Sequence, residues 1–351
     1  FFSPHNPKKL YCAGNVLFAT EDEGQTWTAL SPDLTTNDKT KQKSSGGPIT
    51  QDNTSVEYYC TIFTGTESFL EKDLLWTGSD DGLIHVSRDG GKNWENVTPK
   101  DAPKSMMWNC VDVDPFKKGT AYFAGTRYKL DDYTPYIYKT EDYGKSWKLI
   151  TNGINKMHFA RTMRADHKRP GLLYAGTEFG MYISYDDGAS WKSFQLNMPV
   201  VPITDMTIKE NDLIITTQGR GIYLIDDLTV LQQAKAELLT KNLYVFDVNP
   251  TWRMQVNPFA GRFGSPRNAG ENPPAGVLIN FYAKDVTDSS KASVSIMDKN
   301  KKLIKQFSTD GKEKMEIKQG LNQFSWNLLY PPAEPSEGMI LWNGAPGTIT
   351  A

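Results

Sequence analysis

The stretch Thr20-Glu-Asp22-Glu-Gly24-Gln-Thr26-Trp27 decides the fold, because the same pattern returns three more times along the chain. The later copies are Ser87-Arg-Asp89-Gly-Gly91-Lys-Asn93-Trp94, Thr140-Glu-Asp142-Tyr-Gly144-Lys-Ser146-Trp147 and Ser184-Tyr-Asp186-Asp-Gly188-Ala-Ser190-Trp191. The shared pattern is Ser/Thr-x-Asp-x-Gly-x-Thr/Ser/Asn-Trp. Four copies of an eight-residue pattern indicate a repeat architecture.

The chemistry of this turn explains its residues. The short aspartate side chain is expected to accept hydrogen bonds from backbone N–H groups two or three positions later, and the glycine supplies the positive φ of a tight hairpin. The tryptophan offers a large apolar face to a neighbouring sheet, so we expect all four indoles to be largely buried. The residues given this structural role are Asp22, Gly24, Trp27, Asp89, Gly91, Trp94, Asp142, Gly144, Trp147, Asp186, Gly188 and Trp191.

Alternating apolar runs precede the turns and have the period of half-buried strands. Examples are 82–86, 135–139 and 180–183, and a degenerate fifth copy at 212–225 lacks the turn. The spacings between successive repeat tryptophans are 67, 53 and 44 residues, which suit one four-stranded blade each. The predicted fold is therefore all-β, a partial β-propeller of about five blades in this chain.

Changes in composition and in apolar periodicity divide the chain into three segments. Residues 1–227 hold the propeller blades. Residues 228–275 combine a short amphipathic helix, predicted over 228–239, with a linker rich in Pro and Gly. Residues 276–351 contain further short strands, which predict a truncated immunoglobulin-like β-sandwich with Trp326 in its core.

Composition excludes several classes of function. A net charge of −2 argues against a protein whose main function is to bind nucleic acid or anionic lipid. No apolar run is long enough to span a bilayer. Three cysteines and four scattered histidines, including His85 in a strand pattern, indicate no disulfide framework and no metal site. Cys60 and Cys110 are expected to be buried free thiols, with a disulfide between them as the alternative. No phosphate-binding loop is present, so we predict no cofactor.

The repeated turn is identified as the Asp-box, or bacterial neuraminidase repeat, and the chain resembles propellers that carry it, namely sialidases, xyloglucanases and the sortilin-type receptor domain. It is more similar to the sortilin-like propellers of large secreted bacterial proteins that are often labelled glycosyl hydrolases. The resembling segments are 3–7, 31–35, 131–136, 176–180 and 219–227. The resemblance implies a bacterial protein that is extracellular, at the cell surface or periplasmic, with Asp-boxes that are structural.

Blade geometry separates the turns from the ligand face. The repeat turn joins the third and fourth strands, so the hairpins between the second and third strands open on the opposite face, where ligands usually bind. The candidate ligand-binding residues there are Asp80, Asp81, Arg127, Tyr133, Tyr136 and Arg220. The carboxylates considered for catalysis are Asp131, Asp132 and Glu178, for which ordinary loop charges are the competing interpretation.

Two functions from different classes remain open. The first is a non-catalytic propeller that binds a protein, peptide or glycan partner. The second is a glycoside hydrolase of the xyloglucanase type, which needs two carboxyl groups about 5–5.5 Å or 6.5–9.5 Å apart. A sialidase is disfavoured, because no arginine triad for a substrate carboxylate is evident.

Five blades are few for this architecture, and we expect the end blades not to close on each other. An open propeller exposes apolar sheet faces, so further polypeptide or another subunit is expected to cover them. The motivating apolar positions are Leu10, Val16 and Phe18 in the first blade and Ile214, Ile222 and Leu224 in the fifth.

Overall fold

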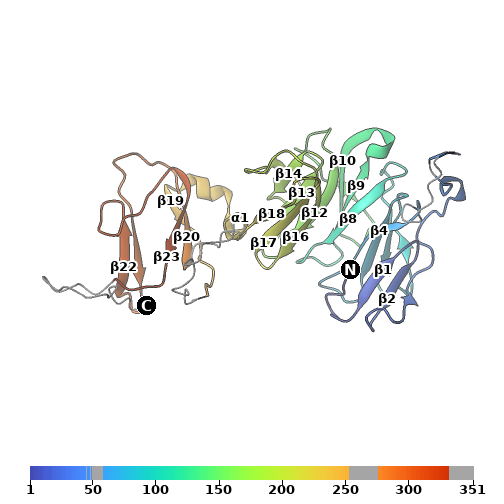
Figure 1. Ribbon diagram of the computed structural model, residues 1–351, viewed down its shortest axis with the longest axis horizontal. Coiled ribbons are helices and arrows are strands. Elements are labelled where there is room, and N and C mark those ends of the chain that lie inside the picture. Colours follow the sequence, from blue (N-terminus) through green and yellow to red (C-terminus); the bar gives the residue numbers. More distant parts are fainter. Residues whose placement is uncertain (45, 48, 50–57, 253–275, 332–351) are drawn as a thin grey trace. The chain divides into compact units, whose positions relative to one another are not determined.

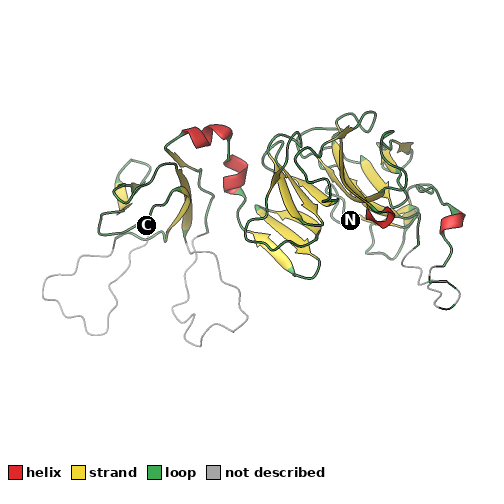
Figure 2. Cartoon of the chain, turned by 90° about the horizontal axis from the view of Figure 1, so that it is seen from above, coloured by secondary structure: helices red, strands yellow, loops and turns green. Residues whose placement is uncertain are grey.

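The computed structural model describes residues 1–44, 46–47, 49, 58–252 and 276–331. The chain divides into two compact units, Phe1–Leu228 and Thr229–Ala351. In the first unit, five antiparallel sheets follow one another along the chain (Figure 1). Strands dominate both units and the helices are short (Figure 2). The predicted all-β propeller architecture is therefore confirmed.

Each sheet of the first unit is one blade. Blade one contains β1 (Leu10–Ala13), β2 (Leu17–Thr20) and β3 (Thr28–Ala29), and blade two contains β4 (Ile62–Glu67), β5 (Leu75–Ser79), β6 (Ile84–Ser87) and β7 (Glu95–Asn96). Blade three contains β8 (Met107–Val113), β9 (Ala121–Arg127), β10 (Asp132–Thr140) and β11 (Lys148–Leu149). Blade four contains β12 (Ala160–Ala165), β13 (Leu173–Thr177), β14 (Gly180–Ser184) and β15 (Lys192–Ser193), and blade five contains β16 (Ile203–Lys209), β17 (Asp212–Thr217) and β18 (Ile222–Ile225). Two 3-10 turns, η1 (Lys39–Lys41) and η2 (Tyr128–Leu130), lie in connections.

Strands pair with their sequence neighbours inside every blade, and the repeat turn always precedes the short outermost strand. Residues whose pairing partners lie at the same position of the repeat are therefore structurally equivalent in their blades. Leu10 pairs with Thr20 in blade one, just as Leu75 pairs with Ser87 in blade two. This register makes positions of different blades directly comparable.

The hydrophobic core consists of layers between successive blades. Trp76 of blade two and Trp108 of blade three are fully buried in one layer, and Tyr122 of blade three contributes to the next layer with Met163 of blade four. Blades one and five lie at opposite ends of the unit and do not pack against each other (Figure 1).

The expected burial of the repeat tryptophans is confirmed for Trp191, which is 4% exposed, and is wrong for Trp27, which is 43% exposed. Trp94 and Trp147 are half-buried. The physical reason is that each indole lies against the preceding blade, and the described residues contain no blade in front of blade one. Burial of these side chains is therefore set by a tertiary neighbour rather than by the turn itself.

The second unit has its own small core. It contains α1 (Thr229–Gln233), η3 (Ala236–Thr240), β19 (Leu243–Val245), β20 (Val277–Ala283), β21 (Ser293–Met297), β22 (Leu303–Ser308) and β23 (Gly320–Trp326). These strands form a three-stranded sheet, β19-β20-β23, and the hairpin β21-β22. Trp326 packs against a core of Phe281, Phe307 and Met315.

The second unit differs in part from what its sequence predicts. The helix predicted over 228–239 is interrupted, because Lys235 has an extended backbone with φ −129° and ψ 154° between α1 and η3. Pieces this short gain few internal hydrogen bonds and depend on packing. The immunoglobulin-like sandwich stays a prediction, and residues 253–275 of the linker and 332–351 of that segment lie outside the described residues.

Candidate ligand-binding site

The aspartates of the repeat turns are engaged within their own turns. The Oδ1 atom accepts the backbone N–H four residues later in every copy, at 2.9 Å from Thr26 to Asp22 and 2.8 Å from Ser190 to Asp186. The spacing of this recurring bond is four positions, and the predicted bond from three positions later is also found, from Lys92 to Asp89 and from Lys145 to Asp142. Hydrogen bonds from the Asn93 side chain and backbone lower the pKa of Asp89 to about 2. These carboxylates are therefore tied to the hairpin.

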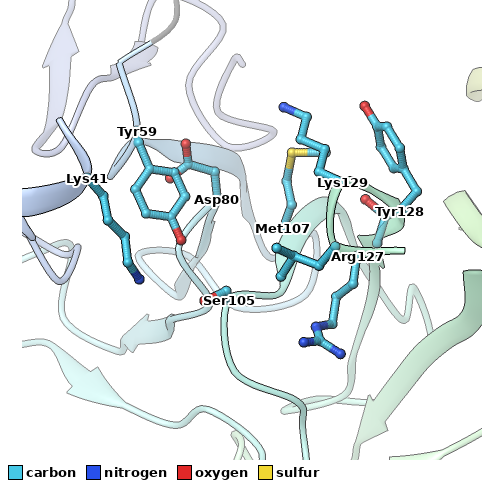
Figure 3. Close-up of a pocket in the computed structure, with 10 residues that line it drawn as sticks. Lys41, Tyr59, Asp80, Ser105, Met107, Arg127, Tyr128 and Lys129 are labelled. Atoms are coloured by element: carbon cyan, nitrogen blue, oxygen red, sulfur yellow. The ribbon is translucent and has the colours of Figure 1, made fainter. Parts of the chain in front are cut away.

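The opposite face carries a cavity of about 400 Å³ between blades two and three. Figure 3 shows Lys41 and Tyr59 on one side of it and the segment Arg127–Lys129 on the other. The cavity is lined by Lys41, Tyr59, Asp80, Ser105, Met107, Thr126, Arg127, Tyr128, Lys129 and Leu130. Basic groups, phenol rings and apolar side chains thus line one cavity, which suits a ligand with both polar and apolar parts.

Four chain segments build the walls. Lys41 and Tyr59 come from the connection between blades one and two, Asp80 from the hairpin between β5 and β6, and Ser105 from the connection to blade three. The last wall is the lengthened hairpin between β9 and β10, in which η2 ends at Asp131 with a left-handed φ of 57°. A register shift between Asp132 and Tyr136 interrupts the pairing of β9 with β10 in the same hairpin.

Arg127 is held in place by groups behind the cavity. Its Nη1 donates to Asp132 Oδ2 at 2.6 Å and its Nε donates to the Lys104 backbone oxygen at 3.1 Å. The Tyr136 hydroxyl donates to the same Asp132 oxygen at 2.9 Å. Partial burial raises the pKa of Asp132, but hydrogen bonds from Thr134, Tyr136 and Arg127 outweigh it, so the net pKa is lowered. Asp132 is therefore an ionised partner of Arg127.

Asp80 and Asp81 have different environments although they are adjacent. Asp80 Oδ1 accepts the backbone N–H groups of Cys60 at 3.0 Å and Thr61 at 2.8 Å, while burial and the neighbouring Asp81 raise its pKa. Asp81 is buried beneath the hairpin, where it accepts hydrogen bonds from Thr36 N–H and Oγ1 at 2.7 Å and from Ser79 Oγ. Asp80 faces the cavity, and Asp81 holds the loop.

An aromatic cluster continues the surface from η2 toward blade four. The rings of Tyr128 and Phe159 stack with centroids 5.1 Å apart, and Tyr133 lies 6.1 Å from Phe159. Arg161 covers the Tyr128 and Phe159 rings and donates from Nε to Glu178 Oε2 at 2.6 Å. Glu178 is therefore paired with a guanidinium and lies beside the aromatic cluster.

Of the predicted ligand-face residues, the structure brings Asp80 and Arg127 together in the cavity. Tyr136 is buried and does not line it, Tyr133 is exposed on the same hairpin, and Arg220 is exposed in the β17–β18 hairpin of blade five and is not among the lining residues. Asp131 is exposed at the end of η2.

Sequence reasoning missed several lining residues. The unusual length of the third blade's hairpin signals Tyr128, Lys129 and Leu130. Nothing in the pattern of the sequence signals Lys41 and Tyr59, because they lie in a connection that has no counterpart in the other blades.

The described part of the chain offers neither a metal-binding cluster nor a helix that could cross a membrane. It contains no cluster of three or more His, Cys, Asp or Glu side chains arranged to hold a metal ion. Its helices include none long and apolar enough to cross a membrane. Cys60 and Cys110 are buried free thiols, and Cys12 is an exposed one.

A family model for sortilin (sortilin, neurotensin receptor 3) matches residues 82–220. No curated protein matches the chain. Similar solved structures include the GH74 xyloglucanase from Xanthomonas campestris, with 14% identity and a TM-score of 0.44 over 62% of this chain and 33% of that one. The GH74 enzyme of Niastella koreensis has 13% identity and a TM-score of 0.46 over 64% of this chain and 35% of that one.

A further similar structure is YCF48 bound to D1 peptide, with 19% identity and a TM-score of 0.37 over 47% of this chain and 51% of that one. The chain spans about a third to a half of the length of these proteins. The identities are too low for the activities in those names to be transferred to this chain.

Proposed function

We propose that the first unit is a sortilin-like, Asp-box propeller that acts as a binding module, taking a segment of a protein, peptide or glycan partner in the cavity between blades two and three. The proposal places it outside a bacterial cell or at its surface. The cavity carries the proposal, because it combines Lys41, Arg127 and Lys129 with the rings of Tyr59 and Tyr128 on the hairpin face.

The arrangement of the charges supports binding over catalysis. Arg127 is fixed by Asp132 and Arg161 is paired with Glu178, so two of the three carboxylates considered for catalysis are neutralised by guanidinium groups, and the third, Asp131, is exposed at the end of η2. A general acid needs a raised pKa, whereas the pKa of Asp132 is lowered. A positioned arginine with aromatic neighbours is instead typical of recognition surfaces.

The test starts from peptide and glycan arrays probed with the purified chain. Binding of the strongest hit is then measured by calorimetry for Lys129→Glu and Leu130→Ala, two exposed changes at the cavity that leave the core untouched. We expect at least a tenfold loss of affinity, about 1.4 kcal/mol, in Lys129→Glu. Lys145→Glu, in the repeat turn of blade three on the opposite face, is the matched control. Equal affinity in all variants, or no hit on either array, would contradict the proposal.

A glycoside hydrolase is the second candidate, and one observation favours it. Asp80 faces the cavity with a raised pKa, which is the property of a general acid. This function predicts release of reducing sugar from xyloglucan or related polysaccharides and its loss in Asp80→Asn. An absence of turnover on a broad polysaccharide panel would contradict this second function. The binding assay described above tests the first function independently of that result.

A further inference from the structure

Three successive blade interfaces share one hydrogen bond. The indole N–H of Trp94 donates to the backbone oxygen of Leu30 at 3.0 Å, that of Trp147 to Val97 at 2.7 Å and that of Trp191 to Ile150 at 2.6 Å. Each acceptor lies three residues after the tryptophan of the preceding blade, at the end of that blade's outermost strand. The indole N–H of each blade thus donates a hydrogen bond to an equivalent backbone oxygen of the preceding blade.

The side chain at that acceptor fills a space left by a glycine. A Cβ atom added to Gly91 would lie 2.6 Å from Leu30 O, and one added to Gly144 would lie 2.6 Å from Val97 Cβ. One added to Gly188 would lie 2.5 Å from Ile150 Cδ1. The glycine of each turn therefore serves two purposes, because it has a positive φ and also accepts the branched side chain of the preceding blade.

Blade one has the same glycine and tryptophan, but nothing occupies the space beside them. The nearest atoms to a Cβ on Gly24 belong to the Trp27 ring of the same turn, at 3.7 Å. Trp27 is 43% exposed, and no protein acceptor for its indole N–H is found in the described residues. We call this surface, made by Leu10, Cys12, Phe18, Gly24 and Trp27, the blade-one face.

The sheet part of the blade-one face shows the same contrast. Register from the repeat turn makes Leu10 equivalent to Leu75, Ala121 and Leu173, and Cys12 equivalent to Thr77, Phe123 and Ala175. All six equivalents are at most 1% exposed. Leu10 is half-buried and Cys12 is exposed. Blade one therefore leaves in water a surface that, in blades two to four, is covered by the preceding blade.

We propose that the blade-one face is a docking site for a further four-stranded blade of the same repeat type, which is not among the five described here. Its outermost strand supplies a branched apolar residue, three positions after a repeat tryptophan, to the space beside Gly24. The backbone oxygen of that residue accepts the Trp27 indole N–H, as Leu30, Val97 and Ile150 do for the later blades.

Blade five of a second copy does not meet this description. It has three strands, β16-β17-β18, and no repeat turn, so it lacks the outermost strand that carries both the apolar side chain and the acceptor oxygen. The acceptors of blades one to three are already engaged inside the chain. Self-association through blade five is therefore the outcome that the proposal excludes.

Photo-crosslinking identifies the occupant directly. Phe18, half-buried on the blade-one face, is replaced by p-benzoylphenylalanine and the protein is irradiated in the cells that make it. We expect a crosslinked peptide that contains Ser/Thr-x-Asp-x-Gly-x-Thr/Ser/Asn-Trp followed at the third position by Leu, Val or Ile. The same replacement at exposed Phe116 is the control, and it should not yield such a peptide. A peptide without this pattern, or one from residues 1–351, overturns the proposal.

Cys12 supplies a second readout that needs no substitution. Cys12 is exposed on the blade-one face, whereas Cys60 and Cys110 are buried and report unfolding. We expect N-ethylmaleimide to label Cys12 at least tenfold more slowly in the protein isolated from its source than in the 351-residue chain alone. Equal rates overturn the proposal. Protection that disappears on dilution, with a dimeric mass in sedimentation, also overturns it, because it identifies a second copy as the occupant.

Discussion

The Nζ atom of Lys139 in blade three lies 2.7 Å from Oδ2 of Asp187 in blade four. The Tyr122 hydroxyl donates to the other oxygen of Asp187 at 2.7 Å, so the carboxylate is satisfied entirely by the neighbouring blade. The apolar layer between these blades is thus bordered by a polar contact with defined geometry. Such contacts favour one register of blade packing over others.

Removing the lysine should be costly because Asp187 would be left without its closest cation. The Lys139 side chain is 10% exposed, and we expect Lys139→Met to lower the free energy of unfolding by about 2 kcal/mol, measured by urea denaturation. Lys117 also approaches Asp187, at 3.4 Å, but its side chain is 53% exposed. Lys117→Met should therefore cost less than about 0.5 kcal/mol. Equal losses in the two variants would contradict this assignment.

The repeat tryptophans should differ in their contribution to stability although their turns are alike. Trp191→Ala should cost about 3–5 kcal/mol, since it removes a buried indole and its hydrogen bond to Ile150. Trp27→Ala should cost about 1 kcal/mol in the chain alone, because that ring is 43% exposed. Chemical denaturation of both variants side by side measures the difference. Similar costs would mean that the turn itself, not the preceding blade, determines the stabilisation.

Stability should fall in acid because of the repeat turns. The pKa values of Asp22 and Asp89 are lowered from 3.8 to about 2 by hydrogen bonds from Thr26 and Asn93. A carboxyl with a depressed folded-state pKa stabilises the protein above its unfolded pKa, and this contribution is lost as the pH falls toward 2. Asp89→Asn keeps an acceptor oxygen without titrating, so its unfolding free energy should decline less steeply between pH 4 and pH 2. An unchanged slope would show that the turn is not linked to protonation.

The adjacent carboxylates Asp80 and Asp81 should respond oppositely to the same change. The pKa of Asp80 is raised, so its ionisation lowers stability as the pH rises above 3.8, and Asp80→Asn at pH 7 should leave stability equal or higher. Asp81 accepts three hydrogen bonds, from Thr36 and Ser79. An asparagine oxygen satisfies at most two of these donors, so Asp81→Asn should cost about 1–2 kcal/mol. Thermal melting at pH 7 compares the two, and a destabilised Asp80→Asn would contradict the first half.

The fold was predictable where the sequence repeats itself. The strands around each turn, from the apolar alternation of 82–86 to the turn at Asp89, follow from local chemistry and recur in blades one to four with only small changes. The exposure of Trp27 was not predictable in the same way, because an identical eight-residue pattern gives a buried indole at Trp191. What differs is the neighbouring blade, which local sequence does not encode.

The cavity was predictable only in part for a related reason. Asp80 and Arg127 lie in hairpins whose place on the ligand face follows from blade topology. Lys41 and Tyr59 lie in the connection between blades one and two, which has no periodicity to fix its course. Its path is set instead by contacts such as those from Thr36 to Asp81, which join residues 45 positions apart.

The open arrangement of the blades has a consequence for how the first unit unfolds. Packing connects β4 with β8, β8 with β12 and β12 with β16, and each of these pairs joins neighbouring blades. Such an array behaves as a one-dimensional chain of coupled units, in which the end units have one stabilising partner and the inner units have two. Native-state amide exchange should therefore form a gradient, with slow exchange in blade three and faster exchange toward blades one and five, and a blade docked on either end would shift the slowest exchange toward that end.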